Sequence, residues 1–169
     1  MRIIGIDPGT VCCGYGIVET PNNRDIYHIN SGDVKLKKKD PLPDRLKILH
    51  DSLTATIKEY KPSQLCLEKI FYHKSIRSAF ALGSARGVVL LIAAENKLPV
   101  FEYNSTELKM ALTGYGRAEK RQVQEMVIRI LNLDTSKALM SEDTSDALAL
   151  CICHINSSTF KSQNLTSQQ

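Results

Sequence analysis

The stretch Arg2-Ile3-Ile4-Gly5-Ile6-Asp7-Pro8-Gly9 starts with apolar, mostly β-branched residues and then stops at a turn signal. This pattern predicts a short first strand that ends at Asp7. Residues 14–20 and 26–36 are two further strand candidates, and the turn cluster Pro21-Asn22-Asn23 lies between them. Because the connections are short, we expect the three strands to form an antiparallel meander.

The apolar residues beyond position 43 recur at helical spacing, as in Leu46, Leu49 and Leu53, and Pro62 ends this helix. Short strands are expected at 64–68 and 99–103, with helices at 75–96, 105–112, 119–131 and from 141 to about 156. This alternation predicts parallel crossovers joined to the meander. The expected architecture is one α/β domain over residues 1–156, with a mixed five-stranded sheet flanked by helices, and a polar, flexible tail over 157–169.

The composition is that of an ordinary globular protein, with 43% hydrophobic and 24% charged residues, and the formal net charge of +4 leans mildly toward polyanionic partners. No secretory signal opens the sequence, and the longest apolar stretch, residues 88–94, is much shorter than a membrane span. We therefore expect a cytoplasmic protein without a membrane partner. The odd number of cysteines, 5, indicates reduced thiols, and Cys151-x-Cys153-His154 lacks the second ligand pair of a zinc site.

Four carboxylates stand at the predicted element boundaries. Asp7 and Glu68 each close a strand, and if these strands are parallel neighbours, both side chains emerge at the same sheet edge. Asp143 and Asp146 are three residues apart at the start of the last helix and therefore share one face. Carboxylates are the ligands that Mg²⁺ and Mn²⁺ prefer, and two such ions can catalyse phosphodiester hydrolysis. Four acids gathered without a cation would repel one another.

Each acid also has a structural interpretation. Asp7-Pro8-Gly9 can be a plain turn, and Asp143 can favour the helix dipole. Asp146 lies in the second helical turn, where an acid brings little dipole benefit, and Glu68 directly follows an apolar run. The set of four therefore favours a metal site more than any single member does.

Five segments, in matching order along residues 1–156, resemble the motifs of the RuvC family of Holliday-junction resolvases. The segments are Ile4-Gly5-Ile6-Asp7-Pro8-Gly9-Thr10 with Gly14-Tyr15-Gly16, Glu68-Lys69-Ile70-Phe71, Gly83-Ser84-Ala85-Arg86-Gly87, Gly114-Tyr115-Gly116-Arg117-Ala118-Glu119-Lys120, and Asp143-Thr144-Ser145-Asp146-Ala147-Leu148-Ala149. The resemblance implies a ribonuclease-H-like fold. It also implies a homodimeric endonuclease that resolves four-way DNA junctions by symmetric paired nicks in recombination and repair. A branch-migration motor is the further partner that the resemblance implies.

The resemblance also implies roles for particular residues. The metal-binding catalytic positions hold two Mg²⁺ ions, which Mn²⁺ can replace, and they fall on Asp7, Glu68, Asp143 and Asp146. An aromatic residue that stacks on junction bases falls on Phe71, and basic residues near the scissile phosphate fall on Lys109 and Lys120. The chain departs from relatives at Tyr72-His73-Lys74 and in its tail, which carries only Lys161 as a basic residue.

The charge pattern supports a nucleic-acid partner independently. Between residues 69 and 94 the chain carries several basic residues and no acid, and Lys74 and Arg77 lie close to the aromatic Phe71. Aromatic and basic residues together suit contact with unpaired bases and phosphates. In the helix that follows, Ala79, Gly83 and Gly87 form a stripe of small residues that packs either on the sheet of its own chain or on a twin helix.

Three other functions remain open at this stage. An RNA-directed nuclease could share the fold. The segment Ile4-Gly5-Ile6-Asp7 with Gly9-Thr10 also resembles the first phosphate loop of actin-like and sugar-kinase ATPases, which need a second domain and further glycine-rich motifs. A non-catalytic junction-binding protein is the third, although a pure binder gains nothing from acids placed beside phosphate.

Overall fold

The computed structural model describes residues 1–22, 25–69, 76–134 and 140–166, without the side chains of Arg77 and of residues 159–166. Three strands come first, β1 (Arg2–Asp7), β2 (Cys12–Glu19) and β3 (Tyr27–Lys35). Helix α1 (Leu42–Tyr60), strand β4 (Gln64–Glu68), helix α2 (Ile76–Glu95) and strand β5 (Val100–Tyr103) follow. The chain then continues through α3 (Ser105–Thr113), α4 (Lys120–Ile130) and α5 (Glu142–Thr166).

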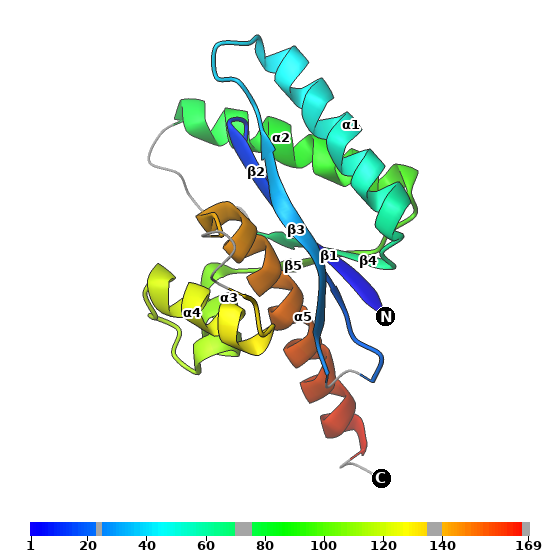
Figure 1. Ribbon diagram of the computed structural model, residues 1–169, viewed down its shortest axis with the longest axis vertical. Helices are drawn as coiled ribbons and strands as arrows, with labels where there is room; N and C mark the ends of the chain where they lie inside the picture. Colours follow the sequence, from blue (N-terminus) through cyan, green and yellow to red (C-terminus); the bar gives the residue numbers. More distant parts are fainter. Residues whose placement is uncertain (23–24, 70–75, 135–139, 167–169) are drawn as a thin grey trace.

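The five strands form one mixed sheet in the order β3-β2-β1-β4-β5. The pairs β1–β2 and β2–β3 are antiparallel, and β1–β4 and β4–β5 are parallel, so the predicted meander and crossovers are confirmed. Helices α1 and α2 cover one face of the sheet, and α3, α4 and α5 cover the other (Figure 1). The period of two in β1 divides its apolar side chains between the two faces, since Ile3 packs below α5 while Ile4 and Ile6 pack below α1 and α2.

Helix α5 lies unusually close to the sheet because glycines remove the side chains beneath it. Gly5 and Gly16 are cross-strand partners in β1 and β2, and Gly14 is the partner of Asp7. A Cβ atom on Gly5 would overlap the carbonyl oxygen of Ala147, and one on Gly14 would overlap the backbone of Asp143. The helix backbone therefore rests directly on strand backbone, as glycine alone permits.

The last helix is longer than predicted. It continues through Thr166, so the expectation that it ends near Asn156 is wrong. Residues 157–166 contain neither proline nor glycine, the residues that end helices most strongly, and a polar composition alone does not stop a helix. The flexibility of the tail stays a prediction.

The cysteines are free thiols, as predicted, and Cys13, Cys66, Cys151 and Cys153 are buried. The two ring nitrogens of His154 form hydrogen bonds with Tyr103 and Gln64, so both are engaged within the chain. The window Ser78–Glu95 of α2 is long and apolar enough to cross a membrane by length and composition, a test that helices of soluble proteins also meet. One face of that helix, with Ala85, Val89 and Ile92, is fully buried in the core of this chain.

Candidate active site

Two strand ends and one helix bring three of the predicted carboxylates into one pocket. In the parallel pair β1–β4, Ile6 is the partner of Leu67, so the next residues, Asp7 and Glu68, leave the sheet at the same edge. Both line a pocket of about 130 Å³ that Asp146 of α5 also lines. The expectation that Asp7 and Glu68 emerge together is therefore confirmed as geometry.

The pocket carries a concentration of negative charge. The pKa of Asp7 is raised from 3.8 to about 7, mainly by burial and then by the charges of Asp146, Asp143 and Glu68. Burial also raises the pKa of Asp146, although the neighbouring Lys120 acts in the opposite direction. A cation among these oxygens would relieve the repulsion, and an all-oxygen donor set suits Mg²⁺ or Mn²⁺.

The two predicted basic residues stand at the same pocket. Lys109 and Lys120 both line it, from α3 and from the start of α4. The Nζ atom of Lys120 lies 3.4 Å from a carboxylate oxygen of Asp146 and 3.4 Å from one of Glu142. Capping boxes at Asn104 and Glu119 begin the two helices, so local hydrogen bonds set where each lysine stands.

Glu68 is held from its backbone. The guanidinium of Arg86 in α2 donates from Nη1 to the Glu68 carbonyl oxygen at 2.8 Å and also pairs with Glu102 in β5. The amide of Lys69 donates to the carbonyl of Tyr103 at 2.8 Å, which continues the β4–β5 ladder past Glu68. Arg86, which sequence analysis treated only as a motif residue and a basic residue, thus ties α2 to the end of β4.

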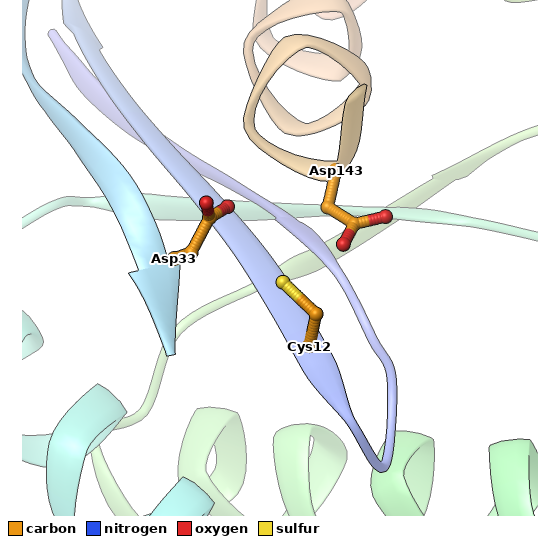
Figure 2. Close-up of side chains that lie close together, drawn as sticks. All are labelled: Cys12, Asp33 and Asp143. Carbon is orange, nitrogen blue, oxygen red and sulfur yellow. The ribbon is translucent and has the colours of Figure 1, made fainter. Parts of the chain in front are cut away.

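Asp143 lies differently from the other three acids. It is not among the residues of the described chain that line the pocket with Asp7. Its carboxylate approaches Cys12 and Asp33 instead, and ligand atoms of these three residues lie within 4.8 Å of one another (Figure 2). Asp143 is nevertheless near enough to raise the pKa of Asp7, so it stands at the edge of the same charged region.

The group of Cys12, Asp33 and Asp143 could hold a metal ion by proximity, but its sulfur is poorly suited to Mg²⁺. Burial, a hydrogen bond to Asp143 and the charge of that residue raise the pKa of the Cys12 thiol to about 12. Without a cation beside it, the thiol is therefore protonated at neutral pH. Cys12 is better described as a neutral neighbour that hydrogen-bonds Asp143.

The other predicted DNA contacts cannot be placed. Phe71 and Lys74 lie outside the described residues, as does the side chain of Arg77, whose backbone belongs to α2. Sequence analysis also missed Asp33. The signal that could have identified it is the alternation of side chains in β3 between the two faces of the sheet. Val34 enters the core below α1 and α2, so its neighbour Asp33 must face α5.

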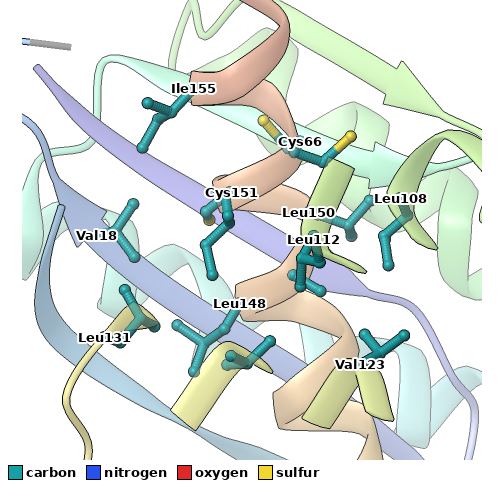
Figure 3. Close-up of a cluster of buried hydrophobic side chains, with 14 of the residues drawn as sticks. Val18, Cys66, Leu108, Leu112, Val123, Leu131, Leu148, Leu150, Cys151 and Ile155 are labelled. Carbon is teal, nitrogen blue, oxygen red and sulfur yellow. The ribbon is translucent and has the colours of Figure 1, made fainter. Parts of the chain in front are cut away.

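Helix α5 is anchored by apolar contacts over residues 148–155. Leu148, Leu150 and Cys151 are buried in a core shared with Val18 of β2 and with Leu112 of α3 (Figure 3). This core leaves the first two turns of the helix, with Asp143 and Asp146, at the sheet edge where Asp7 ends β1. The acids therefore stand on a rigid element, which suits a site that must hold charged groups in fixed positions.

Comparison with known proteins agrees with this geometry. A profile of the family described as crossover junction endodeoxyribonuclease RuvC matches residues 3–154. A relative of that name from Syntrophotalea carbinolica is 47% identical over 154 residues, which cover 91% of this chain and 93% of the relative. Another from Desulfitobacterium hafniense is 42% identical and covers 93% of both chains.

A solved structure extends the comparison to the fold. The structure described as T. thermophilus RuvC in complex with Holliday junction substrate matches with a TM-score of 0.88 at 29% identity, over 95% of this chain and 96% of that one. The expected ribonuclease-H-like fold is thereby confirmed. The profile and the relatives each span nearly the whole chain, and they show that this protein belongs to the RuvC family of crossover junction endodeoxyribonucleases.

Proposed function

We propose that this chain resolves four-way DNA junctions with Asp7, Glu68, Asp143 and Asp146 as its catalytic, metal-binding carboxylates. The observation that carries the assignment is the pocket in which Asp7, Glu68 and Asp146 meet Lys109 and Lys120. These residues come from five separate elements. Turn or capping roles within single elements do not explain why all five side chains line one pocket. The family consists of metal-dependent nucleases, and the relatives described above are named for the cutting of crossover junctions.

The proposed ions are two Mg²⁺, with Mn²⁺ as a substitute. Bound among the carboxylates, they would activate a water molecule and stabilise the oxygen that leaves the phosphodiester. The chain itself contributes oxygen donors held on β1, β4 and α5. Lys109 and Lys120 are placed to offset negative charge on the phosphate in the transition state. The products would carry a 5′-phosphate and a 3′-hydroxyl.

The proposed DNA contacts extend beyond the pocket. Phe71 is proposed to stack on junction bases, and Lys74 and Arg77 to contact phosphates, as the aromatic and basic pattern indicates. A branch-migration motor is proposed as a further partner on the family resemblance, and a location in the cytoplasm is proposed from the free, mostly buried cysteines.

The proposed homodimer uses the outer face of α2. Ile76, Phe80 and Leu91 are 78%, 74% and 54% exposed, and a Cβ atom on Gly83 or Gly87 would meet open space. The spacing of residues 76, 80, 83, 87 and 91 places them in one stripe along the helix. Gly83 and Gly87 of the small-residue stripe therefore do not pack on the sheet of their own chain. An exposed apolar stripe of this kind suits a twin helix, and a two-fold dimer suits a two-fold junction.

Asp146→Asn should abolish cleavage of a labelled synthetic four-way junction in Mg²⁺ while junction binding is retained, because the substitution removes a ligand charge and leaves the fold intact. Rates would be measured beside a matched linear duplex and a matched RNA junction. Asp51→Asn, an exposed carboxylate on α1, serves as the control and should cut at the wild-type rate. Cleavage by Asp146→Asn near the wild-type rate would overturn the site assignment, and equal attack on RNA would favour the RNA-directed alternative.

The stability of the folded chain should depend on pH through Asp7, and Mg²⁺ should reverse the direction of that dependence. The pKa of Asp7 is about 7 in the folded chain and near 3.8 when unfolded, so between these values the folded chain binds more protons. Without metal, stability should therefore fall as pH rises from about 4 to about 7, by on the order of a few kcal/mol. Mg²⁺ favours the charged carboxylate and should stabilise the chain more at pH 8 than at pH 5.

Urea unfolding with Mg²⁺ or with a chelator, at both pH values, measures this difference. Asp7→Asn is the control, because it lacks the titrating group and should lose most of the extra stabilisation at pH 8. Equal stabilisation by Mg²⁺ at both pH values, or no change in the variant, would show that Asp7 does not bind the ion.

Leu91→Asp should convert the proposed dimer to a monomer, because it places a charge on the exposed stripe without disturbing the core. Sedimentation equilibrium measures the mass, and junction cleavage should change from paired to single nicks. Ile48→Asp is the matched control, since Ile48 is also apolar and 43% exposed but lies on α1. A Leu91→Asp variant that stays dimeric would place the interface elsewhere.

A further inference from the structure

One row of residues crosses three strands directly below the start of α5. Asp7 in β1 is the partner of Gly14 in β2, and Gly14 is the partner of Asp33 in β3. Residues that oppose one another across strands point to the same face of a sheet. Asp7 and Asp33 therefore flank a bare position, and the backbone of Asp143 lies over it.

Asp33 is bonded to the first turn of α5 by two hydroxyl groups. Its Oδ1 atom accepts a hydrogen bond from Ser141 Oγ at 2.6 Å and another from Thr144 Oγ1 at 2.7 Å. Ser141 Oγ in turn accepts from the backbone amide of Thr144 at 3.0 Å, so the hydroxyl that Asp33 orients also caps the helix. Thr144 is only 4% exposed, so its hydrogen bond to Asp33 is partly shielded from water.

These contacts fix both the depth and the rotation of the helix start. Ser141 precedes the helix and Thr144 lies within its first turn, so bonds from both to one oxygen leave the turn little freedom to rotate. Thr144 stands between Asp143 and Asp146 in the sequence. A carboxylate near the amino end of a helix also interacts favourably with the helix dipole.

We propose that Asp33 is a positioning residue for the nuclease reaction, which sets where α5 presents Asp143 and Asp146 to Asp7. This inference rests on the proposed function of those acids. Asp33 lies outside the pocket that Asp7, Glu68 and Asp146 line among the described residues, and the contacts of its Oδ1 are to hydroxyl groups. It acts through α5 and has no need of its own contact with substrate.

The test compares variants that separate the hydrogen bonds of Asp33 from its charge. Asp33→Ala removes both acceptor oxygens, whereas Asp33→Asn keeps an amide oxygen that can accept from Ser141 and Thr144. Single-turnover cleavage of the four-way junction would be measured against Mg²⁺ concentration, with junction affinity measured separately. Because small displacements of catalytic groups are costly, Asp33→Ala should cut about tenfold to a hundredfold more slowly and need more Mg²⁺. Its junction affinity should be unchanged, and Asp33→Asn should restore most of the rate.

Two further variants make each outcome decisive. Thr144→Val removes one of the two hydrogen bonds and should show the same effect in smaller measure, even if Asp33→Ala fails to fold. Asp146→Asn reports on the proposed site itself. If Asp146→Asn is inactive while Asp33→Ala and Thr144→Val match the wild type in rate and Mg²⁺ requirement, the positioning role is overturned and the site stands. If Asp33→Asn is as slow as Asp33→Ala, the charge of Asp33 matters directly and positioning is again overturned. An active Asp146→Asn would instead overturn the proposed catalytic site, on which this inference rests.

Discussion

The close contact between helix α5 and the sheet is the constraint on which the site depends. Glycines at positions 5, 14 and 16 allow the helix backbone to lie against β1 and β2, where any side chain would overlap it or a packed neighbour. Since α5 contributes Asp143 and Asp146 and β1 contributes Asp7, the distance between helix and sheet decides whether the acids meet. The apolar core below α5 and the hydroxyl contacts of Asp33 act on the same distance, one along the helix and the other at its first turn.

The price of this arrangement is electrostatic. Burial and like charges raise the pKa of Asp7 to about 7. A divalent cation bound in the pocket would relieve the repulsion among the carboxylates. The Nζ atom of Lys120, 3.4 Å from a carboxylate oxygen of Asp146, offsets part of the negative charge of the pocket. The hydrogen bond from Arg86 to the Glu68 carbonyl oxygen holds the end of β4 in place. Both faces of the sheet thereby serve the site, because α2 holds Glu68 from one face while α5 brings Asp146 from the other.

Much of this could be predicted from the sequence, because strand ends and helical spacing are local signals. The strand at 64–68 and the joint exit of Asp7 and Glu68 followed from apolar runs that end in an acid. The turn of Asp143 toward Cys12 and Asp33 could not be predicted, since it depends on the β2–β3 register and on how α5 rotates above Gly14. The continuation of α5 to Thr166 was missed because polar composition says little about backbone conformation.

Anomalous diffraction from crystals soaked in Mn²⁺ tests the central claim most directly, namely that α5 completes a metal site at the edge of the sheet. The account predicts anomalous peaks about 2 Å from carboxylate oxygens of Asp7, Glu68 and Asp146, with Asp143 as a further ligand. Peaks confined to the group of Cys12, Asp33 and Asp143, or none beside Asp7 at saturating Mn²⁺, would contradict it.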